Sequence, residues 1–143
     1  MPNPTPSELK KLLSNAGFEI YRTAGDRVEL ADRVRDNLIM DSGVSVLAAS
    51  GELVVRFITR AQASEFAGES EEQLFERARR MGAPAVGSGY AEVSTRAVPV
   101  HDPGDRARVL DTWYEVAFEK RVPEDSLTDQ IGYALSLPKS ATR

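Results

Sequence analysis

Two pairs of strand-like segments, separated by a helical segment, most constrain the fold of this chain. In the first pair, residues 44–49 and 53–59 are rich in apolar and β-branched residues and flank a short turn that contains glycine. In the second pair, residues 90–100 and 109–120 alternate in polarity around the polar loop 101–105. Segments of this kind, joined by short turns, pair as antiparallel β-hairpins. We therefore expect an antiparallel sheet.

Three segments have the end signals and the apolar spacing of α-helices. The first lies between Thr5 and Gly17, the second lies between Ser70 and Gly82, and the third covers residues 124–135. Thr5 and Ser70 are each followed three positions later by Glu or Gln, which is the spacing of a capping box. A glycine is placed to end each of the first two helices.

Residues 26–43 fit two interpretations. Several of their apolar residues lie on one broad helical face, and Gly43 is placed to end a helix, so we favour a helix over this range. In the alternative, residues 18–23 and 27–30 form a small hairpin and the helix begins later.

Together these elements predict an α+β fold. Two hairpins separated by a helix favour a two-layer domain, with an antiparallel sheet of about four or five strands and helices packed mainly on one face. The length of 143 residues fits one domain, which we place at residues 1–137. Residues 138–143 lack apolar periodicity and are expected to form a frayed tail.

Composition argues against several kinds of chemistry. The chain has no cysteine and one histidine, His101, so we expect no disulfide, no metal site and no other cofactor. The formal net charge of −4 opposes a general role in nucleic-acid binding. No stretch is apolar enough for a membrane span, and Met1–Thr5 has no apolar region typical of a secretory signal. We expect a cytoplasmic protein.

His101 is the first candidate for catalysis, because it shares its loop with Asp102 and Asp105. The same residues, together with a proline and a glycine, are also typical of a tight turn, and we favour that interpretation. No Gly-x-Ser-x-Gly elbow or glycine-rich phosphate loop is present. We therefore predict no catalytic residue and favour a non-enzymatic protein, while an active site built from carboxylates alone stays open.

Trp113 is the candidate contact residue. Alternation along its strand places it on the face opposite Tyr114 and Val116, on the same side as Val54 and Ile58 from the other hairpin. An apolar patch on an outer sheet face commonly marks a protein contact. We predict that Trp113, Val54 and Ile58 mediate a homodimer or bind another protein. In the alternative, a helix of the same chain covers Trp113.

Arg56, Arg60 and Arg96 suggest a second hypothesis. If they face one groove, their guanidinium groups could bind a small anionic ligand such as a carboxylate or a phosphate. We favour the competing interpretation, in which they form ion pairs across the sheet. The candidate acidic partners are Glu92, Glu115 and Glu119.

Overall fold

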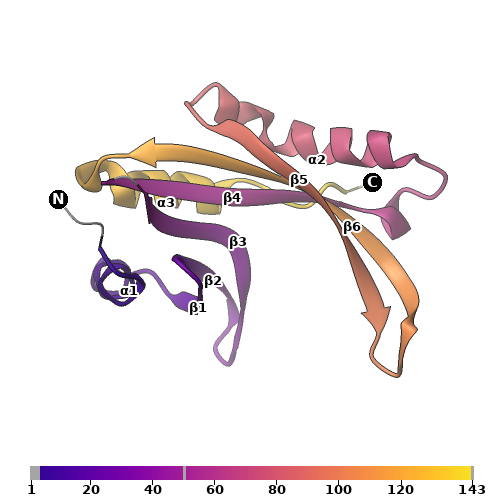
Figure 1. The fold of residues 1–143 in the computed structure, drawn as a ribbon, viewed down its shortest axis with the longest axis horizontal. Coiled ribbons are helices and arrows are strands. Elements are labelled where there is room, and N and C mark those ends of the chain that lie inside the picture. Colours follow the sequence, from indigo (N-terminus) through magenta and orange to yellow (C-terminus); the bar gives the residue numbers. More distant parts are fainter. Residues whose placement is uncertain (1–3, 50, 143) are drawn as a thin grey trace. The chain divides into compact units, whose positions relative to one another are not determined.

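The structure, a computed structural model, describes residues 4–49 and 51–142. Within these residues the fold is α+β, with one antiparallel sheet of six strands and three α-helices (Figure 1). The strand order is β1-β2-β3-β4-β6-β5. In chain order the elements are α1 (Pro6–Asn15), β1 (Ile20–Ala24), β2 (Arg27–Arg35), β3 (Leu38–Ala49), β4 (Glu52–Gln62), α2 (Glu71–Val86), β5 (Ala91–Asp102), β6 (Asp105–Val122) and α3 (Leu127–Ser136). The predicted α+β class is confirmed, with six strands in place of four or five.

The favoured helix over residues 26–43 is wrong. This range forms β2 and the first half of β3, and the two strands pair antiparallel. Val28, Glu29 and Leu30 are buried one after another while Leu38 remains 38% exposed, so the apolar residues do not form one buried helical face. The alternative hairpin is closer to the structure, because β1 pairs with β2 up to Ala24↔Arg27.

The two capped helices are confirmed, although α2 continues past its predicted end. Thr5 and Ser70 form the predicted capping boxes. Gly82 lies inside α2, which runs on to Val86. A Cβ atom at position 82 would lie 2.2 Å from Cε2 of Phe118. The glycine therefore lets the helix approach the sheet closely instead of ending the helix.

The contacts divide the chain into two compact units. Unit 1 comprises residues 1–57 and 119–137, and unit 2 comprises residues 58–118 and 138–143. β4 and β6 contribute residues to both units. The single domain that we place at residues 1–137 stays a prediction.

The core of unit 1 is formed by two helices and the strands that belong to this unit. Its most deeply buried apolar side chains come from α1, β2, β3, β4 and α3. They are Leu9, Leu13, Val28, Leu30, Val44, Val46, Val55, Ile131 and Ala134.

β3 is bent (Figure 1). Gly43 within it has φ +82°. The hydroxyl of Ser42 donates to the carbonyl of Leu30 at 2.8 Å and accepts from the N–H of Val44 at 3.2 Å. These two bonds replace regular ladder bonds at the bend, where the register between β2 and β3 also shifts. The pairing of β3 with β4 ends at Val44↔Phe57.

In unit 2, α2 packs on one face of the sheet (Figure 1). The ring of Phe75 meets the ring of Tyr114 edge-on, with 5.0 Å between centroids. The hydroxyl of Thr59 donates to the carbonyl of Ala78 at 2.6 Å and ties β4 to the same helix. The buried apolar side chains of this unit include Ala61, Phe66, Leu74, Ala78, Ala85, Tyr90, Val116, Ala117 and Phe118.

The segment after α3 pairs with β4 in unit 2. The N–H of Arg60 donates to the carbonyl of Lys139 at 2.7 Å, and the N–H of Ala141 donates to the carbonyl of Arg60 at 2.8 Å. The pairing is parallel, with Ser140 opposite Arg60. The frayed tail over residues 138–143 stays a prediction. The two hydrogen bonds to Arg60 hold the backbone of Lys139 and Ala141 beside β4.

Candidate functional site

The face of unit 2 opposite α2 contains four interacting side chains, which we call the Glu115 cluster: Arg60, Arg96, Trp113 and Glu115. Tyr114 contacts α2, and its neighbours in β6 point the other way. Arg60 comes from β4 and Arg96 from β5, so three strands converge on one carboxylate.

Glu115 is the centre of the cluster, and its side chain is only 7% exposed. Its Oε2 accepts from Nε and Nη2 of Arg60 at 3.2 and 2.9 Å. Its Oε1 accepts from Nη2 of Arg96 at 2.9 Å. A buried carboxylate needs charged hydrogen-bond donors to offset its lost hydration, and the two arginines supply them.

Trp113 is half-buried because Arg60 covers its ring. The guanidinium carbon of Arg60 lies 4.0 Å from the ring centroid, which is a cation–π contact. The same guanidinium is fixed by Glu115, and its backbone is fixed by the C-terminal tail. The cover over Trp113 is therefore an arginine held in place by two other contacts.

Asp111 lies on β6 next to this cluster and fixes the loop that follows β4. It accepts from the N–H and the hydroxyl of Ser64 at 2.9 and 2.7 Å, and from the N–H of Thr112 at 2.8 Å. Burial alone would raise the pKa of Asp111, but the hydrogen bonds from Ser64, Thr112 and Trp113 outweigh it and lower this pKa below its usual value.

The six predicted site residues fall into two groups. Unit 2 contains Ile58, Arg60, Arg96 and Trp113. Arg60 and Arg96 meet at Glu115, and Trp113 lies against Arg60. Ile58 is half-buried on β4.

Unit 1 contains the other two, Val54 and Arg56. Val54 is only 4% exposed, so its side chain offers little surface to a partner. Arg56 donates from Nη1 to Oε2 of Glu119 at 3.3 Å, and its Nε is buried with no hydrogen-bond partner among the described residues.

The ion-pair interpretation of these arginines is confirmed for two of its three acidic partners. Glu115 and Glu119 pair with them as predicted. Glu92 pairs instead with Arg79 of α2, through bonds of 2.6 and 3.2 Å. The helix reaches this edge of the sheet, which strand alternation alone does not reveal.

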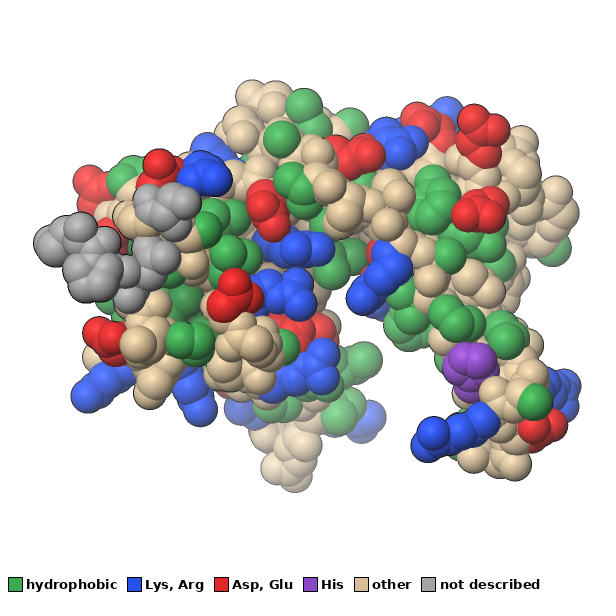
Figure 2. Space-filling model, viewed as in Figure 1, with side chains coloured by type: hydrophobic (Ala, Val, Ile, Leu, Met, Phe, Trp, Pro, Cys, Tyr) green, Lys and Arg blue, Asp and Glu red, His purple; other side chains and the backbone are tan. Residues whose placement is uncertain are grey.

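Two stretches of the β5–β6 hairpin are exposed throughout, and we call them together the outer ribbon: residues 91–97 of β5 and 105–110 of β6. Glu92, near the start of β5, also binds Arg79 of α2. On the face visible in Figure 2, the free end of the hairpin carries hydrophobic, basic and acidic side chains. Val93, Val109 and Leu110 are 48%, 49% and 50% exposed. Sequence alternation assigns Leu110 to the core-facing row and so misses this surface.

The length of β6 in the structure explains why part of the ribbon is uncovered. The 18 residues of β6 extend about 59 Å, whereas the 16 residues of α2 span about 24 Å. One helix of this length leaves part of the hairpin uncovered.

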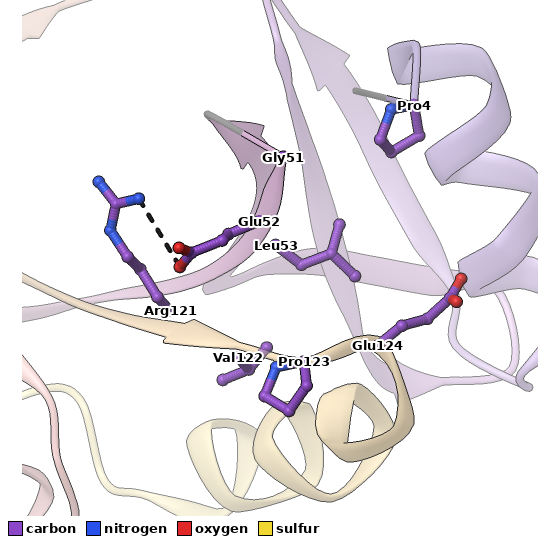
Figure 3. Close-up of a pocket in the computed structure, with 8 residues that line it drawn as sticks. All are labelled: Pro4, Gly51, Glu52, Leu53, Arg121, Val122, Pro123 and Glu124. Atoms are coloured by element: carbon purple, nitrogen blue, oxygen red, sulfur yellow. Dashed lines mark ion pairs between the residues drawn. The ribbon is translucent and has the colours of Figure 1, made fainter. Parts of the chain in front are cut away.

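Unit 1 has a shallow pocket of about 490 Å³ (Figure 3). Its lining residues are Pro4, Gly51, Glu52, Leu53, Arg121, Val122, Pro123 and Glu124. Nη1 of Arg121 lies 3.7 Å from Oε2 of Glu52, and both side chains are more than half exposed. An exposed ion pair of this kind is worth little and is screened by salt, so the pocket has no organised polar centre.

The predicted loop 101–105 is a two-residue turn at Pro103 and Gly104, and His101 belongs to β5. Asp102 accepts from the N–H of Gly104 at 2.8 Å, and Asp105 accepts from the N–H of Ala107 at 3.1 Å, so both carboxylates serve the turn itself. Across residues 4–49 and 51–142, no three His, Cys, Asp or Glu side chains gather as metal ligands would. No helix in that part of the chain has the length and apolar composition needed to cross a membrane.

The comparisons with known proteins give no assignment for this site. No family model, curated protein or solved structure matches the chain. The functional argument therefore depends on the side chains of the Glu115 cluster and the outer ribbon.

Proposed function

We propose that the protein is a non-enzymatic interaction module that forms a homodimer through the outer ribbon of unit 2. The observation that carries this proposal is the half-exposure of Val93, Val109 and Leu110 on one hairpin. A two-stranded ribbon is at best marginally stable in water without a surface packed against it. Val109 and Leu110 are consecutive in β6, so they expose apolar side chains on opposite faces of this hairpin. Exposed apolar side chains on a sheet commonly mark protein contacts.

The composition of the outer ribbon is compatible with a second copy as the partner. Complete burial of a Val or Leu side chain stabilises by about 1.5–3 kcal/mol, and these three side chains have obtained only part of that. The ribbon has three arginines and two acidic residues, so two copies face little net repulsion there. A contact between identical patches about a two-fold axis is the commonest form of assembly.

The test is the molar mass in solution, measured by light scattering after gel filtration over a range of concentrations. We expect twice the 15.7 kDa mass of the chain. Val93→Lys places a charge in the contact and should give a monomer. Val86→Lys is the matched control, because Val86 is 52% exposed but lies on α2, and it should stay dimeric. A wild type that is monomeric throughout contradicts the proposal, as does a dimeric Val93→Lys.

We also propose that Trp113 and Ile58 border this contact, because both are half-buried on unit 2. Trp113→Ala removes the ring on which Arg60 stacks and should weaken the dimer less than Val93→Lys does. The same light-scattering series measures both effects. Equal loss of dimer in the two variants would place the centre of the contact at the Glu115 cluster instead.

A second candidate function is the binding of a small anion by Arg60 and Arg96. Two guanidinium groups share one carboxylate, and the Arg96 side chain is 69% exposed. A ligand at 100 times its dissociation constant stabilises the protein by about 2.7 kcal/mol, which thermal unfolding detects. Inorganic phosphate should then raise the unfolding temperature of the wild type and not that of Arg96→Ala. No rise with phosphate or with carboxylates contradicts anion binding.

A further inference from the structure

We infer that two copies join edge to edge through residues 91–97 of β5, which pair antiparallel about a two-fold axis at Ser94. This inference rests on the proposed homodimer and specifies its contact. The two sheets would then become continuous through their β5 edges.

The position of β5 in the sheet is the first support. β5 is the last strand in the order β1-β2-β3-β4-β6-β5, so β6 is its only strand neighbour among the described residues. The outer side of an edge strand presents N–H and C=O groups that a further strand can pair with. Residues 91–97 are exposed without interruption, so no other element of the described chain occupies this edge.

The sequence of this segment is self-complementary about Ser94. Glu92 and Arg96 lie two positions before and two positions after Ser94. In an antiparallel pair centred on Ser94, Arg96 of each copy comes opposite Glu92 of the other. Opposite charges in directly opposed positions stabilise a strand pair, and like charges destabilise it.

Three other self-pairings of β5 are less favourable. Centring on Glu92 or on Arg96 places two like charges opposite each other. Centring on Thr95 brings Pro99 into the paired stretch, and proline has no N–H to donate. Pro99 lies beyond residues 91–97, so the pairing about Ser94 ends before it.

The existing ion pairs leave both charged side chains able to contribute. Arg96 donates to Glu115 from Nη2, and its guanidinium has further N–H groups. Glu92 accepts two bonds from Arg79, and a carboxylate can accept about four. The contacts within one copy therefore persist when the second copy pairs with β5.

Single cysteines test the pairing, because the chain contains no cysteine of its own. Residues directly opposite each other across two strands have Cβ atoms about 4.5–5.5 Å apart, near the distance that a disulfide spans. Ser94→Cys lies opposite itself at the two-fold axis and should form a covalent dimer under mild oxidation.

Ala91→Cys and Ala97→Cys are the matched controls, since both positions are as exposed as Ser94 on the same strand. Position 91 of one copy is about 20 Å from position 91 of the other in this pairing, which is six residues along a strand. Each control alone should crosslink at least about tenfold more slowly than Ser94→Cys. A mixture of Ala91→Cys and Ala97→Cys should crosslink as heterodimers, because these two positions oppose each other.

The outcomes separate this inference from the homodimer itself. A dimer by light scattering, with fast crosslinking at position 94 and in the mixture, supports both. A dimer in which Ser94→Cys crosslinks no faster than Ala91→Cys overturns the pairing about Ser94 and leaves the homodimer intact. A wild type that stays monomeric overturns the homodimer and the pairing together.

Discussion

At the scale of single residues, replacing Gly82 or Gly132 with alanine should change the stability in opposite directions. Gly82→Ala places a Cβ 2.2 Å from Phe118 and forces α2 away from the sheet, so we expect a loss of about 1–3 kcal/mol. Gly132→Ala in α3 meets no atom within 4 Å and should gain up to about 1 kcal/mol from helix propensity. Chemical denaturation of both variants measures the two free energies. A stabilising Gly82→Ala would contradict the close packing of α2.

The stability of the folded protein should depend on pH through Asp111. Hydrogen bonds lower its pKa in the folded state below the unfolded value of about 3.9. Its contribution to stability is therefore complete above the unfolded pKa and is lost as the pH falls through the folded pKa. Asp111→Asn should be less stable than the wild type at pH 7, and the difference should shrink below about pH 4. Urea denaturation at pH 7 and pH 3 tests this, and a constant difference would contradict it.

Ser64→Ala serves as the companion variant, because it removes one of the donors to Asp111 without changing the charge of the chain. Ser64→Ala should show part of the stability loss that Asp111→Asn shows at pH 7, and this loss should also shrink at pH 3.

The pairing of Asp111 with Ser64 could not be predicted from the sequence, since the two residues are far apart in the chain. Alternation predicted the face of Trp113 and Glu115 correctly, because it depends only on strand geometry.

At the scale of elements, the C-terminal tail should stabilise the backbone of β4 at Arg60. A chain that ends after Leu137 leaves the N–H and C=O of Arg60 without their partners Lys139 and Ala141. We expect a loss of about 1 kcal/mol and faster hydrogen exchange at the Arg60 amide. Ser140→Ala keeps the backbone bonds and should leave that exchange unchanged. An Arg60 amide that exchanges equally fast in the full-length and shortened chains would contradict the pairing.

Elements were predictable from the sequence where local signals decide them. The capping boxes at Thr5 and Ser70 and the turn at Gly104 depend on neighbouring residues, and these predictions hold. Residues 26–43 failed because their apolar residues fit a helical face as well as a strand, and pairing with β1 and β4 decides between the two. The outer ribbon was missed because exposure depends on which part of a strand a helix covers.

At the scale of the whole molecule, a homodimer makes stability depend on protein concentration. The folded dimer is favoured by mass action, so a tenfold rise in concentration should raise the unfolding temperature by roughly 2–4 °C. The Val93→Lys variant, as a monomer, should unfold at a temperature that does not change with concentration. Differential scanning calorimetry at several concentrations measures both, and a wild type without this dependence would contradict the homodimer.

The two edges of the sheet also decide whether assembly can continue. β1, at the opposite edge from β5, is only five residues long, so it offers little template for strand addition. In the proposed pair, the two copies join at the long free edge of β5 in each. Further growth through β5 would then stop at a closed pair, which avoids open-ended filaments of the kind that exposed strands can seed.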